Sequence, residues 1–201
     1  MDFFLKSLYL LGLLVAEGLR LPQRIRHRQA WQQQALIQKR LTGLERLLLV
    51  LLLLGVWLIP ILYVFTPWFA WADYHLPGWA GWLGVAVFVA GLVIRWRAQH
   101  DLGRNYSSTL AIWQEHCLVT DGIYRYVRHP IYAALWLWAL AQPLLLQNWV
   151  AGLAGLVVIL PLYWLRVPRE EALLLEHFGE PYQLYMRRTG RMIPRRLPKV
   201  G

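Results

Sequence analysis

A stretch of polar and charged residues, 116–132, separates two strongly apolar regions and carries many of the side chains able to do chemistry. It ends in Arg128-His129-Pro130, directly before an apolar segment. Proline suits the first turn of a helix and keeps the residue before it out of the helical region, so a helix is expected to open at Ile131. The free N–H groups of that turn, flanked by Arg and His, suit a carboxylate or phosphate. A helix cap facing lipid headgroups explains the same residues equally well.

A second group of candidates begins at Glu170-Glu171. Glu171 shares a helical stripe with Leu174, Leu175 and Phe178, and a carboxylate on an apolar stripe needs a partner or a ligand. The helix dipole alone favours acidic residues at a helix start, which accounts for Glu170 better than for Glu171. Aromatic and basic residues follow and can either steer an acidic acceptor or face headgroups: Tyr182, Tyr185, Arg187, Arg188 and Arg191.

The composition indicates a membrane protein. Of the 201 residues, 58% are hydrophobic and 12 are tryptophan, and the uncharged runs are long enough to cross a bilayer. The net charge of +10 lies between these runs, so membrane topology explains it and nucleic-acid binding is not expected. Cys117 is the only cysteine, and no Cys/His spacing fits a metal site. No pattern specifies the oligomeric state.

Five apolar segments predict an all-α membrane fold of about five transmembrane helices. They are 3–19, 47–65, 79–94, 131–146 and 149–165. A kink is expected at Pro60. The third segment has small residues four apart, a spacing that lets another helix approach closely; they are Ala80, Gly84, Ala86 and Ala90. The last two segments form a hairpin, and short cytosolic helices are expected over 168–178 and 181–188.

Lysine and arginine predict the orientation. All of the 21 basic residues except Lys6 lie in the segments 20–46, 95–128 and 166–201, and the loops 66–78 and 147–148 have none. Five spans with the N-terminus outside and the C-terminus in the cytosol put the three basic segments on the cytosolic side. Segment 20–46 is either an interfacial helix on anionic lipid or a solvated loop or helix.

Taken in order, these motifs resemble the isoprenylcysteine carboxyl methyltransferase family and its bacterial and archaeal relatives. The pattern reads His116-x-Leu118-Val119-Thr120-x-Gly122-x-Tyr124-x-x-x-Arg128-His129-Pro130-x-Tyr132, two apolar helices, Glu170-Glu171, and Phe178-Gly179-x-x-Tyr182-x-x-Tyr185 before a basic cluster and Pro194. It covers about residues 97–194, and the first half of the chain is not diagnostic. Ala134 is a departure, because many members carry glycine shortly after the motif tyrosine.

The resemblance implies a membrane enzyme that binds S-adenosyl-L-methionine in a cytosol-facing pocket and takes a lipophilic acceptor from the bilayer, foremost the carboxylate of a prenylcysteine-like substrate. It divides the chain into an N-terminal transmembrane region, 1–96, and a methyltransferase core, 97–201. The implied cofactor-binding positions are His116, Leu118, Val119, Gly122, Tyr124, Arg128, His129, Tyr132, Glu170 and Glu171.

Arg128 and Glu171 are the expected catalytic residues. Arg128 can hold a carboxylate with two hydrogen bonds. Glu171 or Glu170 can accept hydrogen bonds from ribose hydroxyls or from the cofactor's ammonium group. The substrate is expected to meet Tyr182, Tyr185, Arg187, Arg188 and Arg191, and no metal is expected.

Other functions fit the same residues. A membrane sterol or steroid reductase that uses NADPH has a similar His-Pro-x-Tyr piece and aromatic tail, although the acidic pair suits a 2′-phosphate poorly. A non-catalytic membrane scaffold with the same fold is a further alternative. A phospholipid amine or a small thiol is also compatible as methyl acceptor. The compact length and the absence of a retrieval signal indicate a prokaryotic inner membrane.

Overall fold

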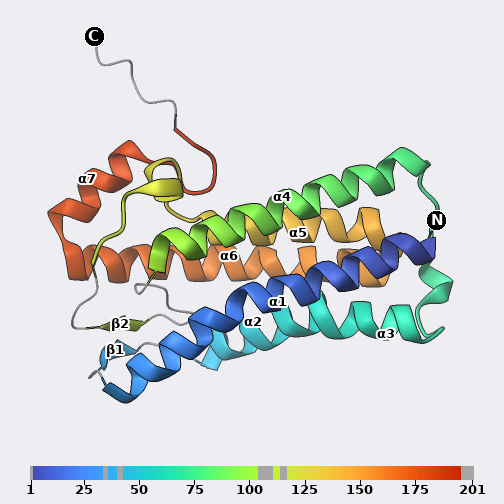
Figure 1. Cartoon of the computed structure of the whole chain (residues 1–201), viewed down its shortest axis with the longest axis horizontal. Coiled ribbons are helices and arrows are strands. Elements are labelled where there is room, and N and C mark those ends of the chain that lie inside the picture. Colours follow the sequence, from blue (N-terminus) through green and yellow to red (C-terminus); the bar gives the residue numbers. More distant parts are fainter. Residues whose placement is uncertain (1, 34–35, 40–42, 104–110, 114–116, 196–201) are drawn as a thin grey trace, which may run out of the picture.

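The computed structural model describes residues 2–33, 36–39, 43–103, 111–113 and 117–195, which form a bundle of long helices (Figure 1). The helices are α1 (Asp2–Gln33), α2 (Gly43–Leu53), α3 (Ile59–Phe65), α4 (Gly78–Leu102), α5 (Pro130–Leu146), α6 (Trp149–Phe178) and α7 (Glu180–Arg188). Shorter turns are the π-helical η1 (Leu54–Leu58) and the 3-10 helices η2 (Ala70–Ala72) and η4 (Gly122–Arg125). The predicted helical class is confirmed.

Two features of the N-terminal half differ from expectation. The first helix does not end near residue 19 but continues through much of the basic segment to Gln33. A two-stranded antiparallel ribbon, β1 (Leu36–Lys39) with β2 (Ala111–Trp113), follows where only helix or loop was predicted. A pairing between strands so far apart in the chain leaves no periodic signal in either short segment.

Three helical segments of the described chain are long and apolar enough to cross a membrane: Arg46–Phe65, Gly78–Leu102 and Trp149–Phe178. They contain three of the five predicted spans. The fourth, α5, has 17 residues and rises only about 26 Å, which is less than the roughly 30 Å of bilayer hydrocarbon. Helix α1 is not among the three, so the five-span topology remains a prediction.

Different segments of the chain lie at the two ends of the bundle (Figure 1). The chain's N-terminus and the loop between α3 and α4 lie at one end, whereas α7 and the β ribbon lie at the other. Side chains of the α5–α6 turn fix the first end: Asn148 Nδ2 donates to Asp73 Oδ1 and to the Phe69 carbonyl, each at 2.7 Å. Asn148 also caps α6, because its Oδ1 accepts from the N–H groups of Val150 and Ala151.

Helix α4 packs closely against α1 and α5 through residues without side chains. A Cβ on Gly81 would lie 2.5 Å from a Leu5 methyl, and one on Gly84 would lie 2.8 Å from Leu144 Cβ. Of the predicted small residues, Ala80 and Gly84 are buried, but Ala86 and Ala90 are exposed. The buried stripe continues instead through Phe88 and Gly91, which keep the three-to-four-residue spacing of one helix face.

The expected irregularity at Pro60 takes the form of the π-helical turn η1. Proline has no N–H to donate, so the carbonyls one turn earlier need other donors. The hydroxyl of Tyr9 donates to the Val56 carbonyl at 2.8 Å, and Gln142 Nε2 donates to the Gly55 carbonyl at 3.0 Å. Helices α1 and α5 therefore both bind this turn.

The last apolar span does not stop where predicted. Helix α6 continues through Pro161 and Pro168 to Phe178, so the separate helix expected over 168–178 is wrong. Proline ended the prediction because it removes an N–H and crowds the preceding turn. Tertiary packing holds the helix together instead: Val167, beside Pro168, is fully buried against Tyr132 and Tyr163. Only α7 remains a separate C-terminal helix.

Candidate functional site

The start of α5 is joined by backbone hydrogen bonds to the segment after α7. The N–H groups of Arg128 and His129 donate to the carbonyls of Gly190 and Arg191 at 2.9 and 2.8 Å. His129 is the N-cap of α5 with non-helical angles (φ −125°, ψ 57°), and Pro130 is the first helical residue. The proline rule therefore predicted this helix start correctly, to within one residue.

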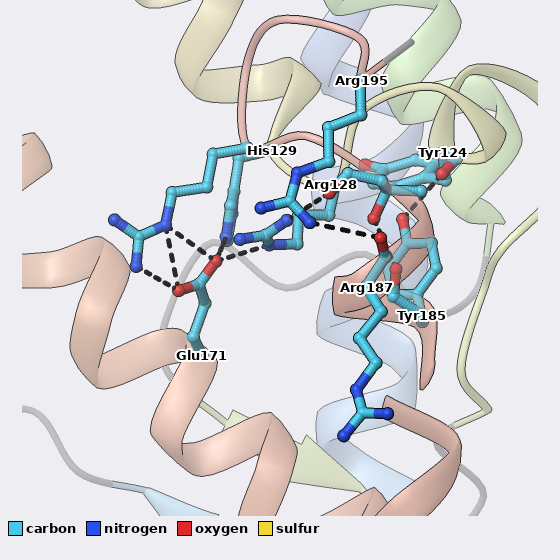
Figure 2. A network of polar contacts seen from close by, with 9 residues as sticks. Tyr124, Arg128, His129, Glu171, Tyr185, Arg187 and Arg195 are labelled. Carbon is cyan, nitrogen blue, oxygen red and sulfur yellow. Dashed lines mark hydrogen bonds and ion pairs between the residues drawn. The ribbon is translucent and has the colours of Figure 1, made fainter. Parts of the chain in front are cut away.

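Glu171 lies at the centre of a buried cluster of charges (Figure 2). Its Oε1 accepts from Arg128 Nε at 2.6 Å and from His129 Nε2 at 3.1 Å. Its Oε2 accepts from Arg191 Nη2 at 2.6 Å, while Arg191 Nε reaches both oxygens. Figure 2 shows the carboxylate pointing away from α6 toward Arg128 and His129. We call these four residues, Arg128, His129, Glu171 and Arg191, the charge hub.

Burial differs within the charge hub. The side chains of Arg128, His129 and Glu171 are 8%, 3% and 5% exposed, whereas that of Arg191 is 40% exposed. Arg128 Nη1 also donates a hydrogen bond to the Thr189 carbonyl at 2.6 Å. The hydrogen bond to Glu171 raises the pKa of Arg191, so its guanidinium stays charged. The hub therefore joins α5, α6 and the segment after α7 at one buried point.

The two glutamates differ in the capacity they have left. A carboxylate has about four lone-pair positions, and the donors of the charge hub occupy those of Glu171. Glu170 is half-buried and accepts one hydrogen bond within the described part of the chain, from Tyr132 OH at 3.0 Å. Glu170 is therefore the member of the pair that can accept further donors.

The loop before the charge hub is held by the end of α4. Asp101 Oδ2 accepts from the Ile123 N–H at 2.8 Å and from Arg97 Nε at 3.0 Å. Gly122 has φ +60°, and a Cβ there would lie 2.1 Å from Asp101 Oδ2. Both its left-handed backbone and the approach of Asp101 therefore require glycine at this position. Tyr124, in the turn that follows, is buried.

Helix α7 covers the same loop with its two tyrosines. Gly179 (φ +60°) and Pro181 separate α7 from α6, as predicted. Tyr185 OH donates to the Tyr124 carbonyl at 2.7 Å, and Thr189 Oγ1 donates to the Tyr185 carbonyl. Tyr182 is 1% exposed, and its hydroxyl has no hydrogen-bond partner in the described chain. Burial raises the pKa of both tyrosines, so both hydroxyls stay protonated at neutral pH.

The structure brings most of the predicted site residues together, with some exceptions. Arg128, His129, Tyr132, Glu170, Glu171 and Arg191 meet through side chains, and Tyr124 meets Tyr185. Gly122 shapes the loop, and Leu118 and Val119 are half-buried in the irregular stretch before it. Arg187 and Arg188 are exposed on α7, and Figure 2 draws the Arg187 side chain away from Glu171. His116 lies outside the described residues.

Sequence reasoning missed Asp101 and Thr189. Asp101 could have been noticed, because it stands four residues after Arg97 on one helix face. Thr189 acts through its backbone carbonyl, which every residue has, so its type carries no signal. Its threonine side chain matters only locally, as a hydrogen bond to the preceding turn.

The site as a whole suits a ligand with both charges. The charge hub sums two guanidiniums against one carboxylate, so its outer side favours an anionic group. Glu170 can accept from a cation or from hydroxyls. The unpartnered Tyr182 hydroxyl can donate or accept. These groups suit a ligand that carries a carboxylate together with an ammonium group or hydroxyls.

Comparison with known proteins gives one consistent family. Residues 82–176 match the model of the isoprenylcysteine carboxyl methyltransferase (ICMT) family. The protein-S-isoprenylcysteine O-methyltransferase of Schizosaccharomyces pombe is 38% identical over 106 residues, which cover 52% of this chain and 45% of the relative. Protein-S-isoprenylcysteine O-methyltransferase A of Arabidopsis thaliana is 32% identical over 118 residues, which cover 58% of this chain and 60% of the relative.

A solved structure agrees with these sequences. The eukaryotic intramembrane Ras methyltransferase ICMT matches 75% of this chain and 51% of its own with a TM-score of 0.54 and 25% sequence identity. The chain spans about half the length of the curated relatives it matches. Arg128, His129, Glu170 and Glu171 all fall inside the matched segment, whereas Arg191 falls beyond it. Residues 82–176 of this chain therefore carry the sequence pattern of the isoprenylcysteine carboxyl methyltransferase family, as the motifs predicted.

Proposed function

We propose that this protein is an integral membrane methyltransferase that uses S-adenosylmethionine and methylates the carboxylate of a lipophilic, prenylcysteine-like acceptor. The observation that carries the proposal is the match of residues 82–176 to the ICMT family, in the segment that holds Arg128, His129, Glu170 and Glu171. The acceptor class follows from the activity for which the relatives are named. The division into a transmembrane region, 1–96, and a methyltransferase core, 97–201, is part of the same proposal.

The adjacent glutamates have different roles in this proposal. Glu171 positions Arg128 and His129, because all three are buried and bonded to one another. Glu170 contacts the cofactor, because it is half-buried and keeps lone pairs for ribose hydroxyls or the ammonium group. Tyr182, buried on α7, offers a hydroxyl that has no hydrogen-bond partner within the described residues. S-adenosylmethionine, when bound, supplies a methyl group on an electrophilic sulfonium.

The chain needs no general base for this chemistry. An acceptor carboxylate is already ionised at neutral pH. His129 Nε2 lies 3.1 Å from Glu171 Oε1, so this nitrogen is engaged within the charge hub. The protein's contribution is therefore alignment and the exclusion of water. The closely packed start of α5 and the cover formed by α7 both serve that purpose.

The finer topology belongs to the proposal as well. Five passes, with the N-terminus outside, place the charge hub on the cytosolic side of a prokaryotic inner membrane. The arrangement in Figure 1 supports an odd number of passes, because the chain's N-terminus and α7 lie at opposite ends of the bundle. The cofactor then arrives from the cytosol, and the acceptor arrives through the bilayer.

A binding and transfer experiment tests the function. Detergent-purified protein is titrated with S-adenosylhomocysteine and with NADPH, and methyl transfer from labelled S-adenosylmethionine to N-acetyl-S-farnesyl-L-cysteine is counted. We expect binding of S-adenosylhomocysteine and no binding of NADPH. The product should be a methyl ester whose label is released as methanol by base hydrolysis. Binding of NADPH alone would point to a reductase, and binding of neither nucleotide would point to a scaffold.

Variants of two arginines link the activity to the charge hub. Arg128→Lys keeps the charge but loses the geometry that reaches both Glu171 and the Thr189 carbonyl. We expect turnover to fall by more than tenfold while the protein stays folded. The matched control is Arg46→Lys, at an exposed position of α2 outside the candidate site, which should retain its activity. Wild-type turnover in Arg128→Lys would defeat the assigned role.

A further inference from the structure

A buried glutamine in α4 has no partner for either of its polar atoms among the residues that the structure describes. Gln99 is 2% exposed, and neither Nε2 nor Oε1 forms a hydrogen bond in the described part of the chain. Gln142 on α5 shows what is usual: it is 1% exposed, and its Nε2 donates to the carbonyls of Gly55 and Ala151. Buried polar groups are normally paired, so an unpaired carboxamide points to a missing partner.

The packing of α4 on α5 places Gln99 beside the site. The two helices run antiparallel, with Gly84 against Leu145 and Gly91 against Trp138. Continuing this register brings Gln99 level with the first turn of α5, next to the charge hub. Two residues further along α4, Asp101 holds the loop that precedes α5. This register therefore places Gln99 on α4 beside the start of α5, where the charge hub lies.

The neighbourhood of Gln99 favours an anionic and partly apolar ligand. Arg95, one turn earlier on the same face, is 5% exposed and lies with its guanidinium 5.0 Å from the Trp138 ring centroid. Arg95 belongs to a segment that is apolar enough to span a membrane. Charged residues at such depth face the protein interior and mark the paths of polar ligand groups. A lipophilic acceptor would bring its carboxylate to this wall.

We propose that Gln99 binds the acceptor by recognising an amide N–H and a carboxylate on the same carbon. An N-acylated, S-prenylated C-terminal cysteine presents this pair: Oε1 would accept from the amide N–H, and Nε2 would donate to the carboxylate. A carboxamide is the side chain that offers both an acceptor and a donor at this spacing. The inference rests on the proposed function and adds a residue that distinguishes peptide-like acceptors from simple carboxylic acids.

The test compares two acceptors and two matched variants. The acceptors are N-acetyl-S-farnesyl-L-cysteine and S-farnesyl-3-thiopropionate, which keeps the carboxylate but lacks the amide. The variants are Gln99→Met and Gln142→Met, which replace buried glutamines by an apolar side chain of similar length. For each protein, kcat/KM is measured with both acceptors, together with S-adenosylhomocysteine affinity and the apparent melting temperature.

Recognition by Gln99 predicts opposite effects on selectivity and stability. In Gln99→Met, the preference for the amide-bearing acceptor should fall by roughly threefold to tenfold, as expected for the loss of one neutral hydrogen bond. Its melting temperature should stay level or rise, because Gln99 forms no side-chain hydrogen bond with the described residues. Gln142→Met should melt earlier and keep the wild-type preference, because its bonds are internal.

Several results would overturn the inference. An equal loss on both acceptors would show that the amide is not recognised. A loss of S-adenosylhomocysteine affinity without a change of preference would place Gln99 on the cofactor. A lower melting temperature with unchanged preference would make it structural. Wild-type protein that methylates neither acceptor would instead refute the proposed function, and with it the inference.

Discussion

Replacing Glu171 by glutamine keeps the shape of the side chain and removes the charge at the centre of the charge hub. The carboxylate oxygens accept from Arg128, His129 and Arg191. A glutamine offers one acceptor oxygen and turns an N–H₂ group toward donors. Arg128, which is only 8% exposed, then keeps its positive charge without a counterion.

The size of the effect follows from this burial. Removing one partner of a buried ion pair costs about 3–5 kcal/mol, because the other charge stays desolvated. The pair with Arg191 adds at most about 1 kcal/mol, since that side chain is 40% exposed and solvent screens it. For a chain of this length, each kcal/mol lowers the melting temperature by about 2–4 °C, so the expected decrease is roughly 6–24 °C.

The assay is the apparent melting temperature of detergent-purified protein near neutral pH, without ligand, followed by tryptophan fluorescence. Glu170→Gln is the matched control, because Glu170 accepts one hydrogen bond, from Tyr132, and should lose only about 0.5–1.5 kcal/mol. A melting temperature of Glu171→Gln within about 2 °C of wild type, or a larger decrease for Glu170→Gln, would refute the division of roles between the two glutamates.

Three further predictions concern the loop, the hairpin and pH. Gly122→Ala should weaken S-adenosylhomocysteine binding at least about tenfold, because the new Cβ meets Asp101 at a positive φ; Gly18→Ala, with open space around it, is the control, and equal affinities would contradict the account. Asn148→Ala should lower the free energy of unfolding by about 1–2 kcal/mol through the lost cap of α6, measured by denaturant unfolding. Because the pKa of Tyr182 is raised in the folded protein, its contribution to stability is complete below about pH 10 and is lost above it, at about 1.4 kcal/mol per pH unit. Melting temperatures from pH 8 to pH 11 should therefore fall less steeply in Tyr182→Phe than in wild type.

The sequence was sufficient to predict which segments meet at the site. A helical hairpin brings the start of α5 and the far end of α6 to the same end of the bundle, so Arg128 and Glu171 had to be neighbours if both legs formed. Their contact at 2.6 Å confirms this. The prediction that these two residues meet rested on the order of the motifs along the chain. A connection of only two residues between two helices leaves them antiparallel.

The sequence could not reveal which groups inside the site would be satisfied by the protein itself. Arg128 was expected to hold a ligand carboxylate, but in the structure it binds Glu171 and a backbone carbonyl of Thr189. Backbone partners have no sequence signature. For the same reason the sequence could not predict that Gln142 has backbone hydrogen-bond partners whereas Gln99 has none among the described residues. The two residues are of the same type and differ only in their surroundings.

Local rules failed where tertiary packing opposed them. Pro168 predicted a helix end, yet α6 continues because the buried Val167 and Glu171 on its inner face are held by other elements. Ala86 and Ala90 had the right size for close packing but face outward, and Gly91 takes the contact with Trp138. Spacing identified a face of α4 but could not choose between two small-residue rows.

Helix α6 is one rod of about 45 Å that is long and apolar enough to cross a membrane, and it carries the two glutamates about two turns before its far end. A membrane of different thickness changes the tilt of such a rod, and a small tilt moves its far end by the largest amount. The acyl-chain length of the lipids should therefore change the position of Glu170 and Glu171 relative to the start of α5. Reconstitution in thin and thick vesicles is consequently as informative for catalysis as any substitution.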